Sequence, residues 1–96
     1  MPYKSQIKIV PGKKGKEIMI FDLTTCFWCQ KTKDLLDELN LEYSYVDFDL
    51  LNGEDQKEAF EELSKYNPNI SFPTIIINKG EKNIIGFDES ELRSLA

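Results

Sequence analysis

The chain has 96 residues, of which 41% are apolar, and its 17 acidic and 12 basic side chains give a net charge of −5. This length suits a single domain, and the acidic balance argues against nucleic acid as a partner, since phosphates attract basic surfaces. No apolar run approaches the roughly 18 residues of a membrane span, and no signal-peptide stretch follows the first residues. We expect a cytoplasmic monomer that does not bind membranes.

The first 16 residues differ in charge from the rest. They contain five lysines and no acid, so they contribute +5 and the remaining residues −10. Residues 6–10 alternate in part and end at Pro11-Gly12, which predicts a short edge strand and a turn. We interpret residues 1–16 as a basic N-terminal extension or edge hairpin. Its lysines either are solvated and only increase solubility, or they form a docking strip for an acidic partner.

The next elements read as strand, helix and strand. The apolar run ending at Phe21 predicts a strand over 17–21 that is covered on both faces. A helix is expected from the cysteines to about Asn40, with charged side chains such as Lys33 turned mainly outward. Its apolar face contains Thr32, Leu35, Leu36 and Leu39. Residues 42–48 predict the second strand, which returns parallel to the first.

The C-terminal half predicts a second helix, a hairpin and a last helix. Asn52 is expected to cap the second helix, which ends at Asn67-Pro68. Its predicted buried stripe is Ala59, Phe60, Leu63 and Tyr66. Residues 72–77 and 83–85 form strands joined by a turn, and Asp88 caps the last helix with Glu91 three residues on. The order βαβαββα predicts an α/β fold with a mixed four-stranded sheet, helices on both faces and an optional N-terminal strand.

Cys26 and Cys29 are the only cysteines, and they stand where the first strand gives way to the first helix. The unpaired N–H groups and dipole of a helix start stabilise a thiolate, so we expect Cys26 to be the nucleophile. Cys29 lies one turn deeper on nearly the same face, where it can resolve a mixed disulfide. A structural zinc site needs about four Cys or His ligands and this chain has two, so we expect no metal within one chain. Two cysteines packed as small apolar residues are the remaining alternative.

Side chains near the cysteines leave two questions open. Phe27 and Trp28 are either an exposed docking patch or, for Trp28, part of the core. Asp22 is expected to face solvent at the strand end. A carboxylate there would raise the pKa of the nucleophilic thiol, whereas Lys31 or Lys33 would lower it.

Three sequence segments resemble the glutaredoxin branch of the thioredoxin-like family, and the resemblance covers residues 17–96. They are Thr24-Thr25-Cys26-Phe27-Trp28-Cys29, Phe72-Pro73-Thr74, and Gly86 with Asp88 before the last helix. The resemblance implies a glutaredoxin-like redox domain in which Pro73 is cis and lies against Cys26. The backbone of Phe72 would then pair with a substrate chain. We expect Phe27, Trp28, Phe72, Pro73, Gly86, Phe87 and Asp88 to contact the substrate.

Two positions depart from the pattern of glutathione-using glutaredoxins. Leu23 stands where those proteins usually have a lysine that meets a glutathione carboxylate, and Phe87 replaces the second glycine of a Gly-Gly pair. Glutathione is therefore not the expected reductant, and no cofactor is expected. Gly86-Phe87 is similar to redoxins that serve ribonucleotide reductase and take electrons from a thioredoxin-reductase-type enzyme. Archaeal glutaredoxin-like proteins are similar in having a basic leader before the site.

The sequence thus predicts a thiol–disulfide oxidoreductase that reduces protein disulfides, with a thioredoxin-reductase-type enzyme or another dithiol as electron donor. The alternative is an iron–sulfur carrier, in which Cys26 of two chains and added thiols such as glutathione hold a bridging cluster. The absence of proline after Cys26 permits this alternative. Cys29 disfavours it, because a neighbouring thiol promotes disulfide closure.

Overall fold

The apolar runs of the sequence form the strands of one sheet, and helices lie between them. The computed structural model describes residues 3–96. Its elements are η1 (Tyr3–Gln6), β1 (Lys8–Val10), β2 (Ile18–Asp22), α1 (Phe27–Glu38), β3 (Tyr43–Asp47), η2 (Phe48–Leu50), α2 (Gly53–Tyr66), β4 (Thr74–Ile77), η3 (Asn78–Gly80), β5 (Lys82–Ile85) and α3 (Glu89–Arg93). This order confirms the predicted βαβαββα arrangement with a strand in front. None of the helices described here has the length and apolar character that crossing a bilayer requires.

The strands of residues 3–96 form a five-stranded mixed sheet in the order β1-β3-β2-β4-β5. β2 and β3 are parallel and are connected through α1, whereas the other three neighbouring pairs are antiparallel. β2 and β4 are inner strands, so side chains such as Ile20 and Ile75 are completely buried. The sheet places the C-terminal end of β2, and the cysteines that follow it, beside the start of β4.

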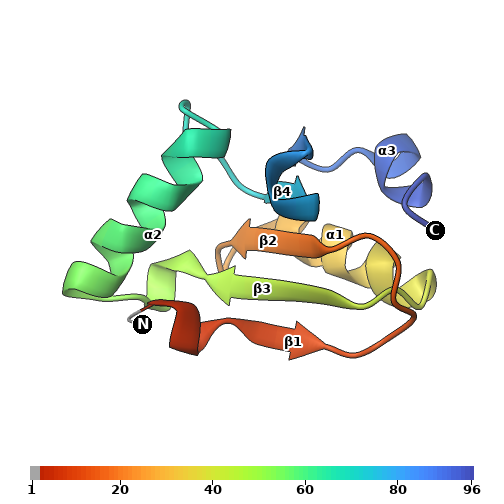
Figure 1. Cartoon of the computed structure of the whole chain (residues 1–96), viewed down its shortest axis with the longest axis horizontal. Helices are drawn as coiled ribbons and strands as arrows, with labels where there is room; N and C mark the ends of the chain where they lie inside the picture. The colour runs from red at the N-terminus through yellow and green to blue at the C-terminus, as the bar shows by residue number, and fades with distance from the viewer. Residues whose placement is uncertain (1–2) are drawn as a thin grey trace.

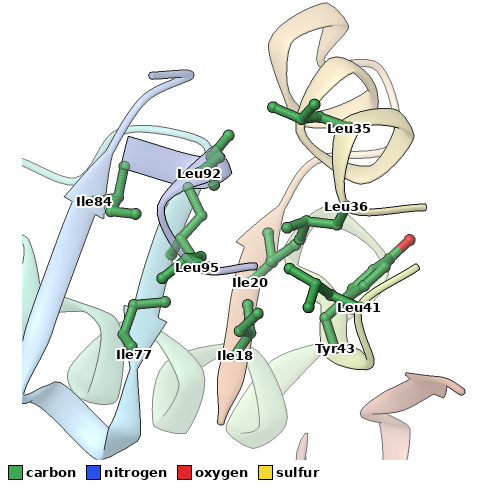
Figure 2. Packing of buried hydrophobic residues seen from close by; sticks show 11 residues of the cluster. Ile18, Ile20, Leu35, Leu36, Leu41, Tyr43, Ile77, Ile84, Leu92 and Leu95 are labelled. Carbon is green, nitrogen blue, oxygen red and sulfur yellow. The ribbon is translucent and has the colours of Figure 1, made fainter. Parts of the chain in front are cut away.

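The helices cover both faces of the sheet (Figure 1). On one face, Ile20 of β2 packs with Leu36 of α1 and Leu92 of α3, as Figure 2 shows. Phe21, the next residue along β2, points to the opposite face and packs with Leu63 of α2. Alternate residues of β2 therefore belong to two cores, which is why its apolar run is unbroken.

Part of the N-terminal segment, β1, belongs to the same sheet. β1 pairs with β3 as an edge strand and does not fold back on β2 as a hairpin. Tyr3 is buried, and its ring centroid lies 6.3 Å from that of Phe21. Lys13 forms a β-bridge with Leu41 just before β3. Because β2 and β3 are parallel, the lysine-rich residues 13–16 lie at the end of the sheet opposite the cysteines.

One predicted helix detail is wrong, one differs by two residues, and one is incomplete. Phe60 is 47% exposed, because Ala59 faces the sheet and the following residue is rotated by about 100° around the helix. The first helix ends at Glu38, and Asn40 has a φ of 57°, which a helix cannot accommodate. Asn52 does occupy the N-cap of α2, but its side chain makes no capping hydrogen bond.

Candidate active site

The turn between β2 and α1 places Cys26 at the N-cap of the helix. Its backbone is extended, with φ −89° and ψ 114°, and its Sγ accepts a hydrogen bond from the backbone N–H of Cys29 at 3.1 Å. The N–H of Cys26 donates to the carbonyl of Leu23 at 3.1 Å, which closes the turn. A donor N–H and the positive end of the helix dipole both favour a negative sulfur at this position. The dithiol therefore lies at a strand-to-helix turn, as the sequence predicts.

The two cysteines differ in exposure. Cys29 is 1% exposed, whereas Cys26 is only half-buried. They are joined in a disulfide, and their Cα atoms are 5.2 Å apart, a common separation for such a bond. The sequence left open that both cysteines are buried and serve only as small apolar side chains. Cys26 is not buried, so that interpretation is wrong. Cys26 is therefore the more exposed member of the pair, and Cys29 is enclosed by the protein.

Three aromatic rings, which we call the aromatic platform, lie beside the cysteines: Phe27, Trp28 and Phe87. The rings of Phe27 and Trp28 meet edge to face with centroids 5.1 Å apart, and Trp28 stacks on Phe87 at 5.4 Å. Phe27 is 63% exposed and Trp28 is 53% exposed. The Nζ of Lys31 lies 5.4 Å from the Phe27 centroid. Trp28 is therefore a surface residue, which decides between the two interpretations of this side chain.

The peptide bond between Phe72 and Pro73 is cis, as the family resemblance implies. The carbonyl of Pro73 accepts a hydrogen bond from the N–H of Gly86 at 2.8 Å. Gly86 has a φ of +80°, a backbone conformation that favours glycine. The ring of Phe72 lies 5.5 Å from that of Phe48 in η2. The segment before β4 is thus joined to two other loops.

A buried asparagine supports this segment, and the sequence did not identify it. Asn67 donates through Nδ2 to the Oγ of Ser71 at 2.9 Å and to the Oγ1 of Thr74 at 3.0 Å. Thr74 in turn donates to the carbonyl of Ser71 at 2.7 Å. In sequence, Asn67 before Pro68 indicated only the end of a helix. No periodic or motif signal marks a residue whose partners are four and seven positions away.

Asp88 caps α3, as predicted. Its Oδ1 accepts a hydrogen bond from the N–H of Glu91 at 3.1 Å. The carboxylate of Glu91 forms an ion pair with Lys82. Asp88 therefore fixes the start of the last helix. It directly follows Phe87, whose ring belongs to the aromatic platform.

The residues predicted from three separate stretches of sequence are connected by a closed series of contacts. The loop before Cys26 contacts η2, and η2 contacts the cis-proline segment. That segment is hydrogen-bonded to Gly86, and Phe87, the next residue, contacts α1. The contacting pairs are Thr24 with Asp49, Phe48 with Phe72, Pro73 with Gly86, and Phe87 with Trp28. Sequence reasoning missed the contribution of η2, because nothing in its composition indicates that it touches two loops.

Asp22 is buried, so the expectation of a solvent-facing aspartate is wrong. It is 1% exposed, and its Oδ2 forms an ion pair with the Nζ of Lys33. Lys33 was expected to turn mainly outward, but its side chain is only 15% exposed. Its Nζ lies 3.7 Å from the ring centroid of Tyr45 and 4.0 Å from Oδ1 of Asp47. The lysine folds back toward the sheet because the carboxylate and the aromatic ring together replace water around the ammonium group.

The environment of Asp22 changes its protonation. Burial raises the pKa of Asp22 to about 6; the hydrogen bond from Lys33 opposes this shift, and Asp47 adds to it. Within the described residues, Oδ1 of Asp22 has no hydrogen-bond partner. Asp22 and Lys33 largely offset each other's charge, so neither acts on the dithiol as an isolated charge. From sequence, Asp22 was expected to raise the pKa of the Cys26 thiol and a nearby lysine to lower it. In the structure, Asp22 and Lys33 form one ion pair.

The described residues include no group of three or more His, Cys, Asp or Glu side chains placed to hold a metal ion. The candidate site itself consists of the half-buried Cys26, the buried Cys29 and backbone groups at the start of α1.

A mixed sheet with helices on both faces, a dithiol at the start of α1 and a cis-proline before β4 define a thioredoxin-like fold with a redox-active cysteine pair. The glutaredoxin family profile matches residues 18–81, and the chain belongs to that family. Among curated proteins, it is 32% identical over 78 residues to a glutaredoxin-like 8.6 kDa protein in the rubredoxin operon of Clostridium pasteurianum. That match covers 81% of this chain and 95% of the relative.

Two solved structures from Methanosarcina species have a higher sequence identity to this chain than the Clostridium relative has. The glutaredoxin from Methanosarcina mazei Go1 is 44% identical with a TM-score of 0.83, covering 93% of this chain and 85% of that one. Methanoredoxin from Methanosarcina acetivorans is 42% identical with a TM-score of 0.77, covering 85% of this chain and 94% of that one. Both agree with the fold and with the resemblance seen in the sequence.

Proposed function

We propose that this protein reduces disulfide bonds in other proteins through Cys26 and Cys29. The observation that carries the proposal is the pairing of a half-buried Cys26, whose Sγ accepts a hydrogen bond from the N–H of Cys29 at the start of α1, with a buried Cys29. A low thiol pKa is useful for attack, and a buried second thiol is useful for resolution rather than for attack on external molecules. We place the activity in the reducing cytoplasm, where a single CxxC is more often catalytic than structural.

The reaction proceeds in two exchanges. The Cys26 thiolate attacks one sulfur of the substrate disulfide, forms a mixed disulfide and releases the other substrate sulfur as a thiolate, which takes up a proton. Cys29 then loses its proton and attacks the Cys26 sulfur, releasing the second substrate thiolate. The substrate gains two electrons and two protons, and the protein is left with the Cys26–Cys29 disulfide. A donor must return two electrons before the next cycle.

The surroundings of the dithiol suit a polypeptide substrate. The cis-proline segment lies outside β4, so we propose that the backbone of Phe72 pairs with an extended substrate chain. The exposed rings of Phe27 and Trp28 offer apolar area to side chains next to the substrate cysteine. A small disulfide needs neither contact, so a preference for protein substrates would be expressed mainly through binding.

We propose further that the electron donor is a dithiol or a thioredoxin-reductase-type enzyme rather than glutathione. Leu23 cannot pair with a carboxylate, and the ring of Phe87 is stacked on Trp28 where glutathione-using relatives have glycine. A double variant, Leu23→Lys with Phe87→Gly, should raise glutathione-dependent reduction of hydroxyethyl disulfide. Dithiothreitol-driven turnover serves as the control for folding. Fast glutathione turnover by the unaltered protein would contradict this part of the proposal.

Reduction of insulin with dithiothreitol as donor tests the main proposal. Cys26→Ser should abolish catalysis, whereas Cys29→Ser should form a mixed disulfide that is not resolved and can be isolated with its partner. Full activity of Cys26→Ser would refute the assignment of the nucleophile. Purification without oxygen tests the iron–sulfur alternative at the same time, since a brown protein with stoichiometric iron would favour the carrier.

A further inference from the structure

Asp49 of η2 holds the loop that precedes the nucleophile. Its Oδ1 accepts a hydrogen bond from the backbone N–H of Thr24 at 3.0 Å, and its Oδ2 accepts one from the Thr24 hydroxyl at 2.5 Å. The hydroxyl bond is the main reason that the pKa of Asp49 is lowered, so the carboxylate is charged at neutral pH. Hydrogen bonds to a charged acceptor are stronger than neutral ones, and two from one residue fix orientation as well as distance.

The anchor itself is fixed. Phe48, next to Asp49, accepts hydrogen bonds at its carbonyl from the N–H of Leu51 at 3.2 Å and from the side chain of Gln56 at 3.4 Å. Leu51 is buried in the core on the α2 face, and the ring of Phe48 lies against Phe72. η2 is therefore a short rigid support that contacts both the nucleophile loop and the cis-proline segment.

The loop that Asp49 holds determines the position of the Cys26 sulfur. Thr24 lies inside the turn that the hydrogen bond from the Cys26 N–H to the Leu23 carbonyl closes. Cys26 is also the N-cap of α1, and its Sγ must sit 3.1 Å from the N–H of Cys29 for the helix start to stabilise a thiolate. A turn free to shift would lengthen that contact, and a hydrogen bond weakens steeply as its geometry degrades.

We infer that Asp49 is a positioning residue of the dithiol, which acts through Thr24 to hold the Cys26 sulfur on the N–H of Cys29. This inference rests on Cys26 being the nucleophile of the proposed function. The inference predicts in which direction the pKa of Cys26 changes when Asp49 is replaced. A carboxylate near a thiol acts through space to raise the thiol pKa, so its removal alone would lower that pKa. Loss of positioning does the reverse, because the thiolate loses its N–H donor.

The experiment measures the alkylation rate of Cys26 by iodoacetamide between pH 4 and 10. It is done in full-length protein carrying Cys29→Ser, which leaves one thiol and preserves the backbone N–H at position 29. Asp49→Ala removes both acceptors. Asp49→Asn removes the charge but can keep both contacts, because its Oδ1 accepts from the Thr24 N–H and its Nδ2 can donate to the Thr24 hydroxyl oxygen. Asp55→Ala is the matched control, since that carboxylate also accepts a side-chain hydrogen bond, from Gln6, away from the loop.

We expect the Asp49→Ala protein to be alkylated about three- to tenfold more slowly than the parent at pH values below the Cys26 pKa, because the thiolate fraction falls tenfold for each unit by which that pKa rises. Asp49→Asn and Asp55→Ala should stay within about twofold of the parent rate, the margin we allow for loss of one surface charge. If Asp49→Ala is poorly folded, Thr24→Val, which loses only the hydroxyl bond, should still slow alkylation. Alkylation of Asp49→Ala at the parent rate or faster would overturn the inference. Because alkylation requires no disulfide substrate, failure of insulin reduction would count against the proposed function alone.

Discussion

The buried carboxyl of Asp22 should make the stability of the protein depend on pH, and replacing it with asparagine should remove that dependence. The pKa of Asp22 is raised from 3.8 to about 6 in the folded protein, chiefly by burial. The folded state therefore favours the protonated carboxyl. The stabilisation is fully present below pH 3.8, where the unfolded chain is also protonated, and it is lost as the pH rises through about 6.

The difference between the two pKa values corresponds to about 3 kcal/mol in the free energy of unfolding, at 1.36 kcal/mol for each tenfold change in the equilibrium. Relative to the unaltered protein, Asp22→Asn should gain about 2 to 3 kcal/mol between pH 4 and pH 8. A constant offset from the lost ion pair with Lys33 does not affect this comparison, because only the change with pH is used.

Urea unfolding of the oxidised protein at half-unit pH steps measures the effect, since the disulfide keeps the thiols from titrating. Asp34→Asn is the control. It removes an exposed carboxylate of α1 that accepts a hydrogen bond from Gln30, and so measures what the loss of one negative charge does by itself. A difference between Asp22→Asn and the unaltered protein that stays constant would show that Lys33 balances burial, and one that shrinks as the pH rises would show that Lys33 outweighs it. Either result would refute the reasoning.

Three other predictions concern the N-terminal segment and the aromatic platform. Tyr3→Ala should lower the free energy of unfolding by about 3 kcal/mol, as for other large buried side chains, with Tyr3→Phe nearly neutral; loss of less than about 1 kcal/mol in Tyr3→Ala would contradict its place in the core. Changing the lysines at 13, 14 and 16 to glutamine should leave insulin reduction within about twofold at low salt, because they lie across the length of the sheet from Cys26, beyond a screening length of about 10 Å. A larger effect that salt suppresses would support the docking-strip interpretation. Trp28→Ala should raise KM for insulin several-fold and leave the rate with hydroxyethyl disulfide nearly unchanged, and equal losses on both substrates would argue for a role in the chemistry.

Local physical rules were enough to predict the order of elements. The unbroken apolar run before Asp22 indicated a strand covered on both faces, and the leucine spacing after Cys29 indicated the helix that covers it. Asp88 was found as a cap because an N-cap acts within three residues of itself. The dithiol was found for the same reason, since the chemistry of Cys26 and Cys29 depends on a helix start that both residues share.

The structure alone showed which distant residues complete the site. Asp49 meets Thr24 across 25 positions of sequence, and Lys33 turns inward because Asp22 and Tyr45 come from two neighbouring strands. A helical pattern indicates which side of a helix is polar, but not whether a long side chain bends back to a buried charge.

The sequence by itself therefore determined the class of chemistry and the strand-to-helix turn on which it depends, since both arise from contacts between near neighbours. Only the tertiary structure decided the charge state around that turn, the exposure of Trp28 and the anchoring of the loop by Asp49. These depend on which strands pair and on how much water the packing excludes, and no local pattern in the chain carries that information.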